Sequence, residues 1–156
     1  RLAESGAGIA VCPSSNLFLG SGFFNFGQAD VHGVRMGLGT DVGAGTSFSL
    51  LHTAGLAYQA ALSRDYPLDP FRALYLATAG SAMLLHIDDR VGGLEPGQEA
   101  DFVLLDCAAT PLLARRTAKA TLAERLFALQ ILGDDRAIAR TYIMGQCAWN
   151  RQGTAS

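Results

Sequence analysis

A single stretch of the chain combines a short apolar run, a glycine-rich loop and a helical pattern, and this order constrains the fold most. Residues 34–40 (VRMGLGT) are typical of a buried strand, and Asp41 follows directly. After the loop GAGTSF, apolar residues recur at helical spacing from Thr46 to Arg64. We expect Thr46 or Ser47 to cap this helix. Strand, glycine loop and helix form one βα unit of a parallel sheet or barrel.

The flanking segments extend this alternation. Residues 6–13 (GAGIAVCP) form a second short apolar run, which a proline ends, and they predict another buried strand. Residues 14–29 mix Ser, Asn and Gly with Leu and Phe, which predicts a loop that packs against other parts of the protein. A further helix is expected over residues 70–85, capped by Asp69. Gly80 in its interior costs about 1 kcal/mol relative to alanine, so we expect close packing there.

The pattern changes after His86. A Pro-Gly turn precedes an apolar run at residues 102–105, which predicts a strand. Residues 121–132 are helical in pattern and end at Gly133, and residues 140–150 predict a hairpin around Gly145-Gln146. We therefore divide the chain into residues 1–90, with βα character, and residues 91–156, with β structure and one helix.

Composition narrows the possible functions. The chain has 156 residues, 49% of them hydrophobic, with 12 Lys+Arg against 14 Asp+Glu and no basic block, which argues against nucleic acid binding. No apolar run reaches the roughly 18–20 residues that span a bilayer, so no membrane partner is expected, and the first residues do not resemble a signal peptide. The absence of an initiator methionine predicts that the chain begins inside a longer protein. Its three cysteines form no C-x-x-C pair, which indicates buried free thiols in a reducing compartment.

Sequence spacing leaves the role of Asp41 open. An aspartate at the start of a glycine-rich turn is ordinary turn or cap chemistry, whereas the carboxyl end of a barrel strand is where reacting groups lie. The three histidines, His32, His52 and His86, form no ligand pair such as H-x-H, so they do not define a zinc site. The chain also lacks a G-x-S-x-G elbow, a P-loop and a dinucleotide fingerprint.

Four segments, in this order, resemble guanine deaminases of the metal-dependent amidohydrolase superfamily. They are CPSSNLFLGSGFF, GLGTDVGAGTSFSLL, GGLEPGQEADFVLLD and LGDDRAIARTYIMGQ, and the resemblance spans about residues 1–152. It implies an α/β fold that is the C-terminal part of a (β/α)8 barrel, together with part of a small β-sandwich. Residues 6–13 and 34–41 would be the last two barrel strands, and residues 91–108 and 140–150 would belong to the sandwich. Because a full barrel takes about 250 residues, the chain is expected to be the last third of an enzyme.

The resemblance also implies an activity and a role for individual residues. Such enzymes hydrolyse guanine to xanthine and ammonia with a zinc-activated water, as part of purine breakdown in the cytoplasm, and are expected to be homodimers. Asp41 is the expected catalytic residue, as metal ligand and proton shuttle, and it also contacts the substrate. Ser15 and Asn16 are candidate substrate-binding residues. Asp134 and Asp135 are expected to be turn charges near Arg136 and not catalytic.

The remaining parts of such a site have no counterpart in the chain. The resemblance places the H-x-H motif, the further histidines, a proton-donating glutamate and the purine-gripping Gln and Arg upstream, so the segment alone is expected to be inactive. Two alternatives stay open. One is a different amidohydrolase deaminase, acting on another purine, a pterin or a triazine. The other is a non-catalytic remnant that serves as a binding or dimerisation module.

Overall fold

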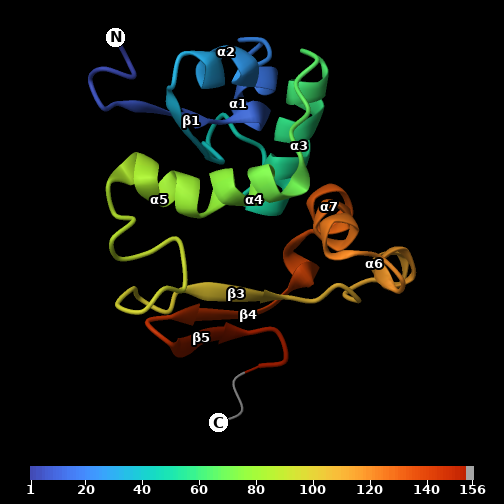
Figure 1. Ribbon diagram of the computed structural model, residues 1–156. Helices are drawn as coiled ribbons and strands as arrows, with labels where there is room; N and C mark the ends of the chain where they lie inside the picture. The colour runs from blue at the N-terminus through green and yellow to red at the C-terminus, as the bar shows by residue number, and fades with distance from the viewer. Residues whose placement is uncertain (154–156) are drawn as a thin grey trace.

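Two groups of elements lie one above the other in the computed structural model, which describes residues 1–153 (Figure 1). The upper group, called here the strand-pair region, comprises residues 8–85, and the lower group, the sheet region, comprises residues 102–150. The strand-pair region contains β1 (Gly8–Val11), α1 (Pro13–Phe18), α2 (Phe26–Val31), β2 (Arg35–Leu38), α3 (Leu50–Leu62), α4 (Pro70–Ala77) and α5 (Ala79–Leu85). The sheet region contains β3 (Phe102–Leu105), α6 (Pro111–Thr117), α7 (Leu122–Leu132), a 3₁₀ turn (Asp135–Ala137), β4 (Ile138–Ile143) and β5 (Gln146–Asn150).

The two strands of the strand-pair region are parallel, with Val11 of β1 opposite Leu38 of β2. Helices α3, α4 and α5 all contact β2, and α5 also contacts β1. The core between these layers includes Phe26 and Leu76, each 1% exposed. The expected strands at residues 6–13 and 34–40 are therefore confirmed, although each regular strand is shorter than the apolar run that predicted it.

The segment predicted as a packed loop, residues 14–29, instead contains α1 and the start of α2. The prediction was wrong because Ser, Asn and Gly outnumber strong helix formers there, while each helix is only 6 residues long. Local signals still start both helices. Pro13 occupies the first turn of α1, and the Asn25 side chain caps α2 by accepting a hydrogen bond from the Gln28 N–H at 2.9 Å.

The two helices after β2 differ in detail from expectation. Helix α3 begins at Leu50, and its cap is Ser49 rather than Thr46 or Ser47. Asp69 does cap the next helix, but the helix predicted over residues 70–85 breaks at Thr78 (φ −130°, ψ −101°) into α4 and α5. The expected close packing at Gly80 is present, because a Cβ there would lie 2.9 Å from Cε1 of Tyr75.

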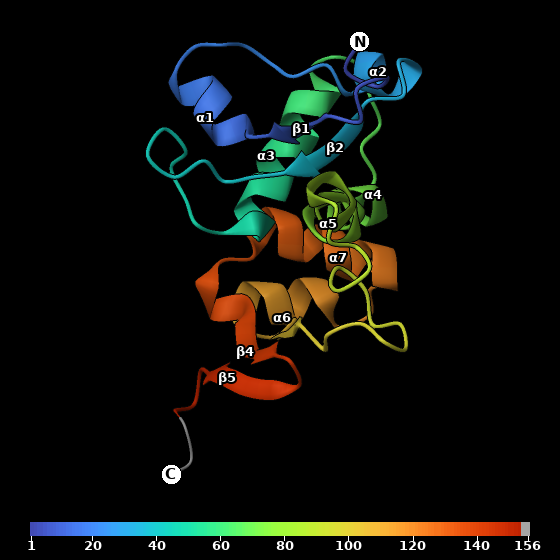
Figure 2. The same ribbon diagram turned by 90° about the vertical axis from the view of Figure 1, so that its left-hand side faces the viewer.

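The sheet region is an antiparallel sheet with the order β3-β4-β5, flanked by α6 and α7 (Figures 1 and 2). The predicted strand and hairpin are confirmed, but the turn residues are Met144 and Gly145, both with positive φ, one position earlier than expected. The prediction of a single helix was wrong, since α6 precedes α7. The start of α6 does have a sequence signal, because Thr110 caps it and Pro111 occupies the first helical position.

The three cysteines differ in their exposure to solvent. Cys12 and Cys107 are half-buried, whereas Cys147 is exposed on the edge strand β5, so the expectation of buried thiols was wrong for Cys147. Among residues 1–153 no helix has the length and apolar character needed to cross a membrane.

Candidate functional site

The carboxyl ends of β1 and β2 meet at one edge, and the segments that leave this edge carry the candidate residues. The parallel pairing continues one step past the strands, since the Gly39 N–H donates to the Val11 carbonyl at 2.9 Å. Glycine in β2 lets α5 approach the strand closely: a Cβ at Gly37 would lie 3.0 Å from the Cα of Ser81. The strand positions are thus fixed by helix packing, and α1 and Asp41 emerge side by side.

Asp41 lies in a tight turn immediately after β2. Its φ is +48°, in the left-handed region that few residues other than Gly, Asn and Asp adopt readily. Its carbonyl accepts hydrogen bonds from the N–H groups of Gly45 (2.5 Å) and Ala44 (3.2 Å). A Cβ at Gly45 would lie only 1.7 Å from the Thr40 carbonyl oxygen, so the turn requires glycine there. The glycine-rich sequence therefore builds the backbone that presents the Asp41 side chain.

The Asp41 carboxylate is held by a residue from the other strand end. Ser15, on α1 and only 4% exposed, donates from Oγ to Oδ2 of Asp41 at 2.6 Å. Among residues 1–153, Oδ1 of Asp41 has no hydrogen-bond partner, and the residue is exposed. One carboxylate oxygen is thus fixed by the protein and the other is open.

The structure brings Ser15 to Asp41 but does not connect the Asn16 side chain with either residue. The hydrogen bonds of Asn16 within the described residues use its backbone: its N–H donates to the Cys12 carbonyl, and its own carbonyl accepts from the Ser21 N–H. Asn16 is half-buried. Sequence reasoning named Ser15 as a loop or substrate residue and missed its bond to Asp41. The signal was available, since both residues follow strands that were predicted to be parallel.

Cys12 lies at the same strand edge, next to Asp41. Burial and the nearby Asp41 carboxylate both raise the pKa of Cys12, with burial the larger cause. Its Sγ lies 3.5 Å from the Ala10 carbonyl, as a donor. A thiol whose pKa is raised is a poor nucleophile and a poor metal ligand at neutral pH.

Asp41 carries a carboxylate, which can bind zinc, but the part of the chain that the structure describes places no set of further ligands beside it. Within residues 1–153 no group of three or more His, Cys, Asp or Glu side chains is placed to hold a metal ion. A catalytic zinc site uses three protein ligands and one open position. A carboxylate with one unbonded oxygen at a strand end fits one of those three ligand places.

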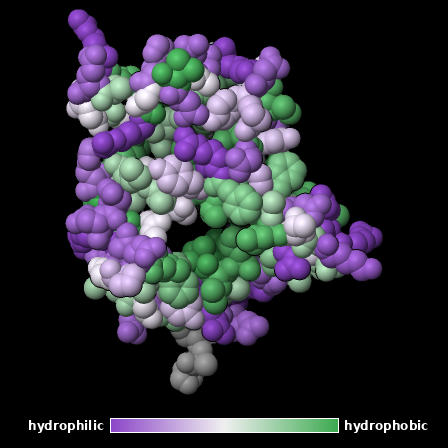
Figure 3. Space-filling view, viewed as in Figure 1, coloured by the Kyte–Doolittle hydropathy of each residue, from purple (hydrophilic) through white to green (hydrophobic). Residues whose placement is uncertain are grey.

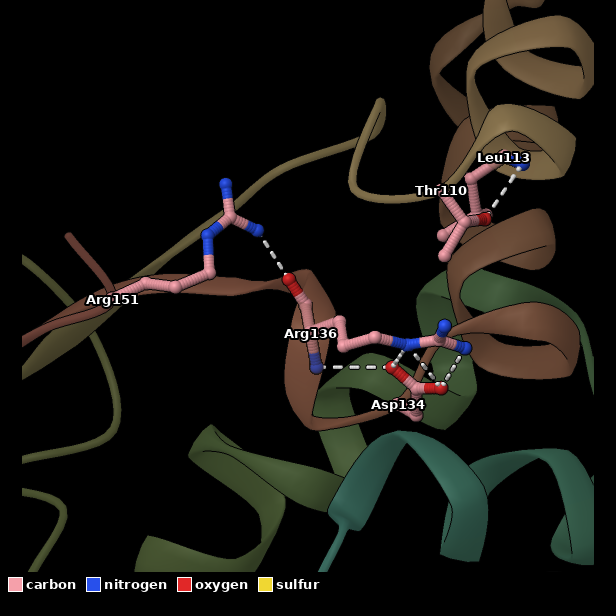
Figure 4. A network of polar contacts seen from close by, with 5 residues as sticks. All are labelled: Thr110, Leu113, Asp134, Arg136 and Arg151. Carbon is pink, nitrogen blue, oxygen red and sulfur yellow. Dashed lines mark hydrogen bonds and ion pairs between the residues drawn. The ribbon is translucent and has the colours of Figure 1, made fainter.

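The LGDDR segment forms a separate polar network at the end of α7 (Figure 4). Asp134 accepts hydrogen bonds from the Arg136 guanidinium at Oδ1 and at Oδ2, and this pairing lowers the pKa of Asp134. Arg151 donates to the Arg136 carbonyl and, at 2.6 Å, to the carboxylate of Asp106. The expected pairing with Arg136 is confirmed for Asp134, and the network joins the residues that follow β3 and β5 to the 3₁₀ turn after α7.

Comparisons with known proteins agree on the family. Residues 1–148 match the model of the amidohydrolase family. The guanine deaminase of Escherichia coli K12 is 46% identical over 152 residues, which are 97% of this chain and 35% of that protein. The solved structure of E. coli guanine deaminase superposes with a TM-score of 0.93, covering 97% of this chain and 36% of that one.

Two more distant solved structures also match, each at 28% identity. One is the guanine deaminase of C. acetobutylicum, described with guanine bound in its active site, with a TM-score of 0.79 over 92% of this chain and 34% of that one. The other is an adenosine deaminase of Xanthomonas campestris, described with bound zinc, with a TM-score of 0.77 over 94% of this chain and 33% of that one.

The chain therefore spans about a third of the length of the relatives it matches. Within that third the match is nearly continuous, and its mixed α/β fold is that of the E. coli enzyme. On this evidence the chain belongs to the amidohydrolase family.

Proposed function

We propose that the complete protein carrying this chain is a guanine deaminase, which hydrolyses guanine to xanthine and ammonia. The observation that carries the proposal is the Asp41 carboxylate at the shared edge of β1 and β2, with one oxygen held by Ser15 and the other open. The similarity to the E. coli and C. acetobutylicum guanine deaminases supports guanine as the substrate.

Asp41 would act as one zinc ligand and as the proton shuttle. Bound zinc lowers the pKa of a coordinated water to about 7, which supplies a nucleophile at neutral pH. The open oxygen of Asp41 would accept a proton from the attacking water and later help deliver it to the departing ammonia. General base catalysis of this kind contributes about 10² to 10⁴ in rate.

The other zinc ligands and the groups that bind the purine would come from outside residues 1–156. The adenosine deaminase relative described with bound zinc supports this metal for the family. Within the chain, Ser15 and Asn16 remain the proposed residues near the substrate. Ser15 already donates its hydroxyl hydrogen to Asp41, so a direct contact with the purine would use its oxygen as acceptor.

The larger architecture is part of the same proposal. Residues 1–90 would complete a (β/α)8 barrel and residues 91–156 a β-sandwich. Their open edges support this, because β1, β2 and β3 each pair on one side only within the described residues, and free strand edges invite a further strand. A cytoplasmic homodimer is proposed from the resemblance alone.

Guanine turnover and zinc content, measured on the chain and on the complete enzyme, test the proposal. The complete enzyme should hold one zinc ion and release xanthine and ammonia from guanine, whereas the 156-residue chain alone should do neither. Substantial turnover by the chain alone would overturn the proposal that its site is completed from outside. If the complete protein prefers another purine, a pterin or a triazine, it is a related deaminase. If the complete protein neither binds zinc nor turns over guanine, the chain belongs to a non-catalytic module.

A further inference from the structure

We propose that Ser15 is a positioning residue, which divides the two oxygens of Asp41 between two tasks. Oδ2 is held by the protein, and Oδ1 would be the oxygen that is free to bind the metal and to exchange the proton. This inference rests on the proposed function and goes beyond it, because it specifies which carboxylate oxygen of Asp41 acts and identifies Ser15 as the residue that orients it.

The contact joins two segments that are distant in sequence. Ser15 and Asp41 are 26 positions apart, yet the Ser15 hydroxyl lies 2.6 Å from Oδ2, the short distance typical of a hydroxyl donating to a charged oxygen. Ser15 is 4% exposed, so water competes little for its hydroxyl. Without this bond, an aspartate side chain at an exposed turn would exchange among several χ1 and χ2 rotamers, and the bond selects one of them.

The backbone of Asp41 is restrained independently. Its φ of +48° and the hydrogen bonds from Ala44 and Gly45 to its carbonyl hold the main chain of the residue in one conformation. With the backbone fixed, the orientation of the carboxylate depends on the Ser15 bond. Removing that hydroxyl should therefore change where the two oxygens lie and leave the turn in place.

Ser14 provides a matched control one residue earlier on the same helix. It is 5% exposed, almost as buried as Ser15, but its Oγ has no hydrogen-bond partner among the described residues. Loss of the Ser14 hydroxyl removes a buried polar atom from α1 without touching Asp41. A difference between Ser15→Ala and Ser14→Ala thus reports on the contact with Asp41 rather than on helix packing.

The test compares Ser15→Ala, Ser15→Thr and Ser14→Ala in the complete enzyme. Loss of an outer partner of a ligand typically lowers metal affinity or activity by about 10- to 100-fold, so Ser15→Ala should lower kcat by that factor and zinc affinity by roughly 10-fold. KM for guanine should stay within about twofold, because losing an interaction that is made only in the transition state lowers kcat without weakening substrate binding. Ser15→Thr keeps the hydroxyl and should restore most of the loss, and Ser14→Ala should resemble wild type.

Zinc affinity, measured by competition with a chelator, gives a readout that does not depend on turnover. If wild type binds zinc and deaminates guanine while Ser15→Ala equals Ser14→Ala in kcat and zinc affinity, the inference is wrong and the proposed function stands. If wild type binds zinc but does not deaminate guanine, the proposed function fails, and the affinity comparison still decides the role of Ser15. A wild-type protein that binds no zinc overturns both.

If Ser15→Thr fails to restore activity, either the hydroxyl has no role or the added methyl group disturbs the fold. The thermal unfolding temperature of the variant distinguishes these two causes. A Thr variant that unfolds at the wild-type temperature yet remains as slow as Ser15→Ala contradicts the role of the hydroxyl. If the added methyl group instead lowers the unfolding temperature, the comparison of Ser15→Ala with Ser14→Ala decides.

Discussion

Strand β2 of the strand-pair region and strand β3 of the sheet region are both short and apolar, but only β2 is buried. Met36 and Leu38 of β2 are 4% and 6% exposed, beneath α3, α4 and α5. In β3, Val103 and Leu104 are 48% and 43% exposed. An apolar cleft of about 570 Å³ lies between α5 and β3, and Figure 3 shows green, apolar surface around this hollow. A strand sequence alone thus does not state whether the strand is covered.

The two regions are also held in different ways. In the strand-pair region, glycines in the strands admit a helix at van der Waals distance, and the Asp41 turn is built on that packed layer. The sheet region is held by strand pairing, by a small core beneath α6 and α7, and by ion pairs such as Arg151 with Asp106. The candidate site thus lies where helix packing fixes the backbone.

The largest effect is expected for Asp41→Asn in the complete enzyme. Asparagine tolerates the left-handed backbone and keeps the hydrogen bond from Ser15, but it cannot accept a proton from water, so turnover should fall by about 10² to 10⁴. Guanine turnover with the thermal unfolding temperature checks this. Asp134→Asn is the matched control in the sheet region and should leave turnover unchanged. Turnover of Asp41→Asn near wild type would refute the catalytic assignment.

A stability comparison tests the difference in burial directly. Leu76→Ala, at a position 1% exposed, should lower the free energy of unfolding of the chain by about 2–5 kcal/mol, because it removes buried surface and leaves a cavity. Leu104→Ala, at a position 43% exposed, should cost less than about 1 kcal/mol, in the range of ordinary surface substitutions.

Urea unfolding of the 156-residue chain measures both values. Equal costs would show that β3 is covered in solution and that the contrast between the regions is wrong. A larger cost for Leu104→Ala in the complete enzyme than in the chain would instead place a further segment over β3 there.

The smallest effect concerns the ion pair of the sheet region. Two hydrogen bonds lower the pKa of Asp106. The larger effect comes from the Arg151 side chain and the smaller one from the Ala108 N–H. A lowered folded-state pKa stabilises the protein above the unfolded value of about 3.9, and this stabilisation is lost as the pH falls through the folded pKa.

Asp106→Asn should therefore be less stable than wild type at pH 7, by at most about 1 kcal/mol because the pair is partly exposed. The difference should shrink as the pH falls from the unfolded pKa of about 3.9 through the lower folded-state pKa. Unfolding temperatures from pH 2 to 7 check this. Asp65→Asn is the control, because Asp65 is exposed and its carboxylate has no ion pair within residues 1–153. A difference that persists at the lowest pH would mean that Asp106 acts through packing and not through its charge.

Much of the element order was predictable because local signals are strong. Asp69-Pro70 and the Thr121 capping box mark helix starts, and the Met144-Gly145 turn closes a hairpin of the predicted kind. Short helices were missed where their residues have weak propensity, as in α1 and α2. The break at Thr78 was missed because tertiary packing of α5 on β2, and not a Pro or Gly at that position, redirects the chain.

Local signals in the sequence place Asp41 after a buried strand and at the start of a glycine-rich turn, and the order of the motifs carries the family resemblance. The hydrogen bond from the Ser15 hydroxyl to Oδ2 of Asp41 is visible only in the folded chain, as is the lack of a partner for Ser14 Oγ among residues 1–153. Parallel strand pairing and helix packing set the distance between segments that are far apart in the chain, and no local pattern encodes that distance.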